Sequence, residues 1–181
     1  RNGEGPRVLL LAGNHGDEYE GQIALSRLSR TLTPDNVRGH VVIVPMANFP
    51  AAKAGLRTAP IEQENLNRSF PGDRDGTVTQ TIAHMLEEEL MAQSDLVIDL
   101  HSGGSSLLYL PAIQVKLDLN GVLEPREKSL ADAYAAPHTH VLHSTPLDNQ
   151  ASSGVRRKGA LYLGAEFAGS GTVTPQALRI C

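Results

Sequence analysis

The sequence has little cysteine, few aromatic residues and no long apolar segment. Cys181 is its single cysteine, which excludes an intrachain disulfide and a zinc site built from cysteine thiolates. Four Tyr and three Phe, with no Trp, are too few to indicate platforms on which nucleic-acid bases stack. Apolar runs such as 8–12 and 41–44 are far too short to span a bilayer.

The charge balance is mildly acidic. Lys and Arg number 16 and Asp and Glu number 20, so the formal charge is −4, which gives no electrostatic footprint for nucleic acid or an anionic membrane. We therefore expect neither as a partner. The first residues do not resemble a signal peptide and the single cysteine fits a reducing compartment, so we expect a cytoplasmic protein.

Strand-like and helix-like segments alternate along a chain of 181 residues, a length that fits one domain, 1–181. The order predicts an α/β fold with a mixed, largely parallel sheet and helices on both faces. Ligands of such sheets gather at the carboxyl ends of the strands. The predicted strands are 7–12, 40–45, 95–100, 107–115, 141–144 and 160–167, and the predicted helices are 18–32, 77–93 and 125–135.

Two of these strands end in residues that can bind a metal ion. His15 and Glu18, three residues apart, follow the first strand, and His101 follows the third. Two histidines and a carboxylate form a ligand set of catalytic zinc, which keeps its fourth position for water. Asp99 and Asp17 are suited to hold the other imidazole nitrogens. The structural alternative is a helix-capping His15, a solvated Glu18 and a buried His101 with ordinary hydrogen-bond partners.

The irregular segment 47–75 is too long for a plain connection, and loops of that length are more often functional. Within it, Arg68 can grip a carboxylate through two parallel hydrogen bonds, and Asn67 can add a polar contact beside it. Arg57 can supply a second cation. Taken alone, Arg68 is better explained as part of a structural ion pair inside the loop.

Glu166 lies at the end of the last predicted strand, where a carboxylate among apolar residues is unexpected unless it is paired or functional. A suitable role is general base for an attacking water and then proton donor to a leaving amine. The turn at 169–171 lacks the patterns of nucleotide-binding loops, and the chain has no GxSxG motif of serine hydrolases. His138, His140 and His143 are interpreted as surface or strand-edge histidines.

Four segments in order together resemble the succinylglutamate desuccinylase/aspartoacylase family, a branch of the zinc carboxypeptidase-like hydrolases. They are Gly13-Asn14-His15-Gly16-Asp17-Glu18, Asn67-Arg68-Ser69-Phe70-Pro71-Gly72, Asp99-Leu100-His101-Ser102-Gly103-Gly104 and Glu166-Phe167-Ala168-Gly169-Ser170-Gly171. The stretch 13–21, with 65–68, is similar to the subgroup that deacetylates N-acetyl-diaminobutyrate.

The resemblance implies a zinc carboxypeptidase-like fold with one Zn²⁺ per chain and a small N-acyl amino acid as substrate. Members of the family carry a β-rich domain after the catalytic one. This chain begins at Arg1 rather than Met and stops before that domain, so we expect a fragment of a longer chain that lacks the C-terminal β domain. The residue roles implied are His15, Glu18 and His101 for the metal, Glu166 for catalysis, and Asn67, Arg68 and Arg57 for the substrate.

We therefore expect a zinc-dependent hydrolase that cleaves the linear amide of an N-acyl amino acid or a related small acid. A zinc carboxypeptidase acting on peptides would use the same metal ligands. A module that binds metal or carboxylate without catalysis would need the ligands but no general base, and the presence of Glu166 disfavours it.

Overall fold

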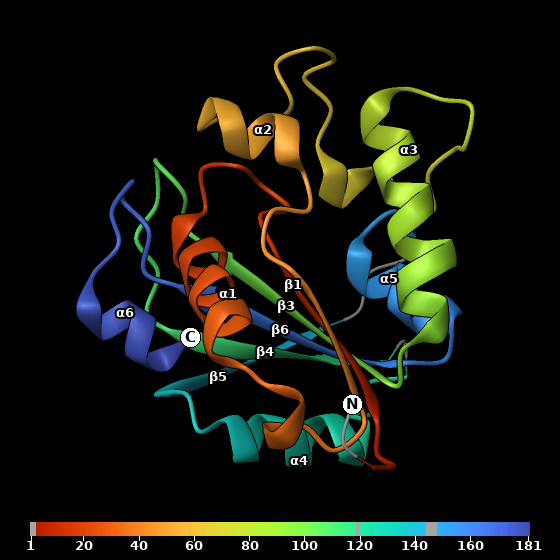
Figure 1. Cartoon of the computed structure of the whole chain (residues 1–181), viewed down its shortest axis with the longest axis vertical. Coiled ribbons are helices and arrows are strands. Elements are labelled where there is room, and N and C mark those ends of the chain that lie inside the picture. The colour runs from red at the N-terminus through yellow and green to blue at the C-terminus, as the bar shows by residue number, and fades with distance from the viewer. Residues whose placement is uncertain (1–2, 119, 144–147) are drawn as a thin grey trace.

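The computed structural model describes residues 3–118, 120–143 and 148–181 (Figure 1). Its strands are β1 (Arg7–Ala12), β2 (His40–Val44), β3 (Leu96–Ser102), β4 (Ala112–Leu117), β5 (His138–His143) and β6 (Leu161–Phe167). Its α-helices are α1 (Tyr19–Thr31), α2 (Phe49–Ala54), α3 (Val78–Met85), α4 (Pro125–Tyr134), α5 (Ala151–Arg157) and α6 (Pro175–Ile180). None of the helices in these ranges is long and apolar enough to cross a membrane.

The described strands form one six-stranded sheet in the order β2-β1-β3-β6-β4-β5. Only the β4–β6 pair is antiparallel among the pairs in this sheet, and the other neighbours are parallel. The predicted mixed, largely parallel α/β fold is therefore confirmed. The parallel neighbours β1, β3 and β6 end at the same edge of the sheet.

Helices cover both faces of the sheet, and successive strand residues point to opposite faces, so each strand contributes to a hydrophobic cluster on either side. In β1, Leu9 and Leu11 are buried in a hydrophobic cluster that also holds Ala83 of α3 and Val155 of α5. The other face carries a second cluster, which includes Ala12 of β1 and residues of α1, α4 and α6. Figure 1 shows α3 and α5 on the opposite side of the sheet from α1.

The predicted helix 77–93 is present, but its helix type changes along its length. Thr77 begins it with a capping box shared with Gln80, and α3 continues into a π-helical turn, Leu86–Leu90, and a 3₁₀ turn, Met91–Gln93. The apolar stripe of Ile82, Leu86 and Leu90 predicts that the glutamates at 87–89 lie mostly on the solvent-exposed side of this helix. Glu88 and Glu89 are exposed, but Glu87 is only 1% exposed because Arg157 of α5 binds its carboxylate through two nitrogens, at 2.9 and 2.7 Å.

Other boundaries differ from the prediction for identifiable reasons. The predicted strand 107–115 is shifted, because 103–111 form a loop whose Tyr109 N–H donates to the Ala168 carbonyl, and β4 begins only at Ala112. The predicted strand 141–144 begins earlier, at the first residue of β5, and Ser144 lies outside the described residues. The irregular segment 47–75 contains α2 and a 3₁₀ turn, Leu66–Arg68.

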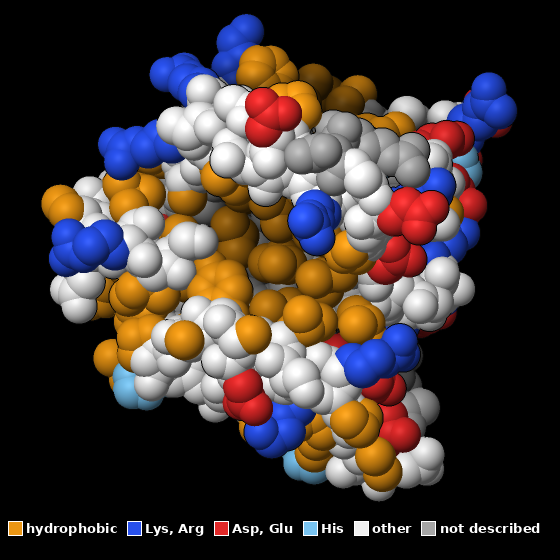
Figure 2. Space-filling model, turned by 60° about the horizontal axis from the view of Figure 1, so that its bottom comes forward, with side chains coloured by type: hydrophobic (Ala, Val, Ile, Leu, Met, Phe, Trp, Pro, Cys, Tyr) orange, Lys and Arg blue, Asp and Glu red, His pale blue; other side chains and the backbone are white. Residues whose placement is uncertain are grey.

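Apolar side chains also reach the surface. Figure 2 shows a face of the molecule on which they gather in a hollow, with basic and acidic side chains spread around its margin. Large apolar residues with more than half of their surface exposed include Ile61, Leu107, Leu108 and Leu110. Leu107 also lines the cavity described below.

Candidate metal centre and adjoining cavity

The carboxyl ends of β1, β3 and β6 bring together the residues predicted for the metal and for catalysis. His15 and Glu18 lie in the turn between β1 and α1, where Gly13 has a φ of +68° that a side chain would disfavour. His101 is the second-last residue of β3, and it is in register with Glu166, the second-last residue of β6. Neighbouring residues in register point to the same face, so these side chains meet above the sheet edge.

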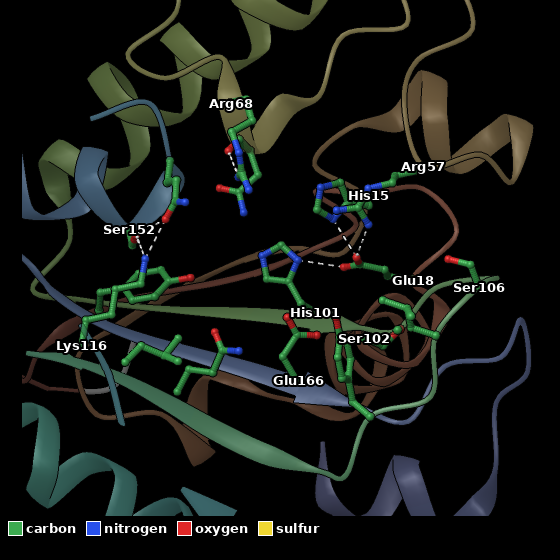
Figure 3. Close-up of a pocket in the computed structure, with 18 residues that line it drawn as sticks. His15, Glu18, Arg57, Arg68, His101, Ser102, Ser106, Lys116, Ser152 and Glu166 are labelled. Carbon is green, nitrogen blue, oxygen red and sulfur yellow. Dashed lines mark hydrogen bonds and ion pairs between the residues drawn. The ribbon is translucent and has the colours of Figure 1, made fainter. Parts of the chain in front are cut away.

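His15, Glu18 and His101 converge on one point, and all three are buried. His15 Nδ1 lies 2.7 Å from Glu18 Oε1, and His101 Nδ1 lies 2.8 Å from Glu18 Oε2. The possible ligand atoms of the three residues lie within 4.8 Å of one another. Figure 3 shows both imidazoles turned toward the Glu18 carboxylate. Two imidazole nitrogens and a carboxylate oxygen are suitable donors for a divalent metal ion.

In both imidazoles, Nε2, the nitrogen that faces away from Glu18, has a hydrogen-bond acceptor that fixes the orientation of the ring. His101 Nε2 lies 3.0 Å from Asp99 Oδ2, and His15 Nε2 lies 3.1 Å from Asn65 Oδ1. Asn65 Oδ1 also accepts a hydrogen bond from the backbone N–H of Asn67 at 2.9 Å, which identifies that atom as the oxygen of the amide. Both Nε2 atoms therefore act as N–H donors, so Nδ1 is the nitrogen of each ring that faces Glu18 and that would offer its lone pair to a metal ion on losing its proton.

The electrostatics of Glu18 keep it ionised. Burial raises the pKa of this carboxyl, but the charge and hydrogen bond of His101, with those of His15, outweigh burial and hold its pKa at about 2. Arg57 adds a contact, since its Nη1 donates to Glu18 Oε1 at 3.3 Å. An ionised carboxylate between two imidazoles is the state that a metal ligand requires.

Glu166 is electrostatically different from Glu18. Burial raises its pKa to about 7, and the nearby negative charges of Glu18 and Asp99 add to the effect, against the opposing influence of His101 and Arg57. Its Oε2 is buried and has no hydrogen-bond partner among the described residues. In Figure 3 its carboxylate lies beside His101 and opens toward the cavity. A carboxyl with a pKa near neutrality can both accept and return a proton.

A cavity of about 440 Å³ adjoins the metal ligands, and it is lined by all seven residues predicted for the site. Asn67 and Arg68 lie on the 3₁₀ turn Leu66–Arg68. Asn67 Oδ1 accepts from the Ala151 N–H at 2.9 Å, which leaves the amide nitrogen as the donor it offers to the cavity. Arg57 is 53% exposed at the side chain and reaches the cavity beside Glu18. The structure thus places every predicted residue at one site.

Two expectations about supporting residues had different outcomes. Asp99 does hold the imidazole of His101, as we expected. Asp17 does not hold an imidazole: its Oδ2 accepts from the backbone N–H and the hydroxyl of Ser105, at 2.9 and 2.8 Å, so it anchors the loop after β3.

Sequence reasoning gave no role to Asn65 or to Lys116. Asn65 stands two residues before Asn67, but nothing in that spacing indicates a contact with His15, 50 residues away. Lys116 lines the cavity from β4, beside Gln150 and Ser152. The predicted strand ended at 115, so the sequence pattern did not place Lys116 on the sheet at all.

Comparison with known proteins gives the chain a family. Its sequence matches the succinylglutamate desuccinylase/aspartoacylase catalytic domain over residues 4–181. It is 43% identical over 180 residues to the N-alpha-acetyl-L-2,4-diaminobutyric acid deacetylase of Halomonas elongata, and the match covers 99% of this chain and 53% of that protein. The chain therefore spans about half the length of this curated relative.

Solved structures give the same assignment. The product-bound ectoine utilization protein EutE (DoeB) from Ruegeria pomeroyi superposes with a TM-score of 0.92 at 37% identity, covering 99% of this chain and 55% of that one. A succinylglutamate desuccinylase/aspartoacylase from Rhodobacter sphaeroides superposes with a TM-score of 0.90 at 38% identity, covering 99% and 53%. The chain belongs to the succinylglutamate desuccinylase/aspartoacylase family, as its sequence motifs predicted.

Proposed function

We propose that this chain is the catalytic part of a zinc-dependent deacylase that hydrolyses the amide bond of a small N-acyl amino acid. The observation that carries the proposal is the meeting of a His-Glu-His cluster with a carboxyl of raised pKa, Glu166, at one cavity. The deacetylase from Halomonas elongata supports it, since that protein is 43% identical and is named for the removal of an acetyl group.

The donor set suits zinc. His15, Glu18 and His101 would hold the ion, because two neutral imidazole nitrogens and one carboxylate are a common ligand set of catalytic zinc. When bound there, zinc supplies Lewis-acid polarisation of water and of the amide carbonyl. Asp99 and Asn65 keep the two imidazoles in the tautomer that presents Nδ1.

Glu166 would move the proton. Its carboxylate takes a proton from the water that attacks the amide carbon, and then returns it to the nitrogen of the leaving amine as the carbon–nitrogen bond breaks. The products are a carboxylic acid and a free amine, so the atoms of one water molecule are divided between them. A pKa of about 7 suits both steps, since near neutral pH the group is a base in one and an acid in the other.

The substrate would be oriented by its own acid group. Asn67 and Arg68 offer an amide nitrogen and a guanidinium to a carboxylate, which holds the scissile amide over the metal ligands. Arg57, beside Glu18, can stabilise the negative charge that develops on the carbonyl oxygen. A cavity of about 440 Å³ is in the range of small-molecule sites.

The test is a metal analysis of the purified full-length protein followed by a hydrolysis panel. We take N-α-acetyl-L-2,4-diaminobutyrate as the first substrate, with N-acetyl-L-aspartate and a dipeptide as comparisons. One zinc per chain with hydrolysis of an N-acyl amino acid supports the proposal. Faster hydrolysis of the peptide would instead identify a carboxypeptidase, and bound zinc without any hydrolysis would identify a binding module.

A further inference from the structure

Two cations on the wall of the cavity differ from the other basic side chains nearby. Most of these neighbours are paired with a carboxylate, in the pairs Arg57–Glu18, Arg156–Glu127, Arg157–Glu87 and Lys158–Glu88. By contrast, no carboxylate of the described residues lies within 4.0 Å of the charged nitrogens of Arg68 or Lys116. Both line the cavity. Positive charge that has no directly paired carboxylate at a binding cavity favours an anionic ligand.

Lys116 is held in place by neutral groups alone. Its Nζ donates to Gln150 Oε1 at 2.7 Å and to Ser152 Oγ at 2.8 Å. Ser152 is only 4% exposed, so the ammonium contacts a largely buried side chain on the cavity wall. An ammonium has three N–H donors, and these two bonds leave one for the cavity. Neutral acceptors compensate a partly buried charge less well than a carboxylate does.

Arg68 and Lys116 approach the cavity from different elements. Figure 3 shows Arg68 projecting from the turn above the cavity and Lys116 entering from β4, with Ser152 beside its ammonium. Arg68 uses one nitrogen, Nη1, on the carbonyl of Asn67, which leaves its other donors available. Burial lowers the pKa of Lys116, and the positive charges of Arg156 and Arg68 lower it further, against the opposing influence of Asp99 and Glu127. A bound anion would relieve this repulsion.

We infer that Lys116 is a substrate-binding residue, which holds the substrate's carboxylate together with Arg68. Gln150 and Ser152 position the ammonium for this contact. The inference rests on the proposed function and deepens it: Lys116 is a second cation for the substrate carboxylate that Arg68 binds. An N-acyl amino acid fits, whereas the same compound with a carboxamide in place of the carboxylate would lose the contact with both cations.

The test compares two ligands in Lys116→Met, which keeps the length of the side chain and removes its charge. The ligands are N-α-acetyl-L-2,4-diaminobutyrate and its α-carboxamide. With the zinc-loaded full-length protein, we expect the KM of the carboxylate to rise about 10- to 100-fold, the usual effect of losing a hydrogen bond to a charged group. We expect the KM of the carboxamide to change less than about threefold, and Lys116→Arg to recover part of the loss.

Two controls separate this role from a structural one. Lys128→Met makes the same charge change on α4, where Lys128 pairs with Asp132, and should leave both KM values unaltered. Zinc content and the melting temperature should also match the wild type in Lys116→Met. Equal changes in KM for the carboxylate and the carboxamide, or no change in either, would overturn the inference.

A binding measurement keeps the inference independent of turnover. Calorimetry with both ligands in the Glu166→Gln background, with and without Lys116→Met, measures the carboxylate contact directly. Absence of hydrolysis in the wild-type protein would refute the proposed function. Equal affinity of Glu166→Gln and of the double variant Glu166→Gln/Lys116→Met for the carboxylate ligand would refute the role of Lys116, whatever the outcome for hydrolysis.

Discussion

Replacing Asn65 by Ala should weaken zinc binding although Asn65 does not touch the metal position. Its Oδ1 accepts from His15 Nε2 at 3.1 Å and from the Asn67 N–H at 2.9 Å, so alanine leaves both donors without that acceptor. The imidazole of His15 then loses the bond that fixes its tautomer and orientation. The turn that carries Asn67 and Arg68 loses its N-cap at the same time.

The expected loss follows from what such outer hydrogen bonds contribute. Removing the acceptor behind a metal-binding histidine costs about 10- to 100-fold in metal affinity. This is about 1.4–2.7 kcal/mol at 1.36 kcal/mol for each tenfold change. Asn65→Asp keeps an acceptor of greater basicity in the same place, so its zinc affinity should equal or exceed that of the wild type.

The assay is competition for zinc between the protein and a chromophoric chelator. Asn36→Ala is the matched control, since it removes an exposed asparagine from a 3₁₀ turn that does not line the cavity. Unfolding curves of the metal-free proteins show whether the variants fold equally well. Zinc affinity of Asn65→Ala within about twofold of the wild type would refute the reasoning that this bond orients His15.

Three further predictions concern the proton-transfer group, the core and the turn of the metal ligands. Because the pKa of Glu166 is about 7, its ionised fraction falls as the pH decreases through that value. We therefore expect kcat/KM to fall about tenfold per pH unit below pH 7 at constant zinc content. A flat profile of kcat/KM from pH 8 to pH 5 would contradict this prediction. Arg157→Ala should leave the carboxylate of Glu87 buried and unpaired, at a cost of about 3–5 kcal/mol. Thermal unfolding should then show a melting temperature lower by about 6–20 °C, and a decrease of about 1 °C or less would be inconsistent with a buried ion pair. Gly16→Ala should reduce zinc affinity, because a Cβ at this position would lie 2.1 Å from the carbonyl carbon of Ala51. The turn that carries His15 would then have to move. Unchanged zinc affinity in the chelator assay would contradict this prediction.

The sequence was sufficient to predict which strand ends bring the candidate site residues together. His15, His101 and Glu166 follow apolar runs that read as buried parallel strands, and the carboxyl ends of such strands meet at one edge. The register between His101 and Glu166 then places both side chains on one face. These relationships need only strand order and alternation, which an apolar pattern indicates well.

The contacts that support the site depend on features that no local pattern encodes. Asn65 meets His15 because the segment 47–75 folds back over the end of β1, a path set by tertiary packing. Lys116 lies outside the predicted strand, 107–115, because the loop after β3 extends to residue 111 and shifts the observed strand β4 to Ala112–Leu117. Glu87 is buried because Arg157, 70 residues further along the chain, binds its carboxylate, and helical periodicity gives no sign of that contact.

The most direct test of the proposed function compares the wild type with Glu166→Gln, both loaded with zinc. Zinc content is measured by elemental analysis, and hydrolysis of N-α-acetyl-L-2,4-diaminobutyrate by the full-length protein is measured by release of acetate. We expect one zinc per chain in both proteins and a kcat about 10²- to 10⁴-fold lower in the variant, as removal of a general base predicts. Equal turnover of the two proteins, or a wild type that binds zinc without releasing acetate from any N-acetyl amino acid, would contradict the proposal.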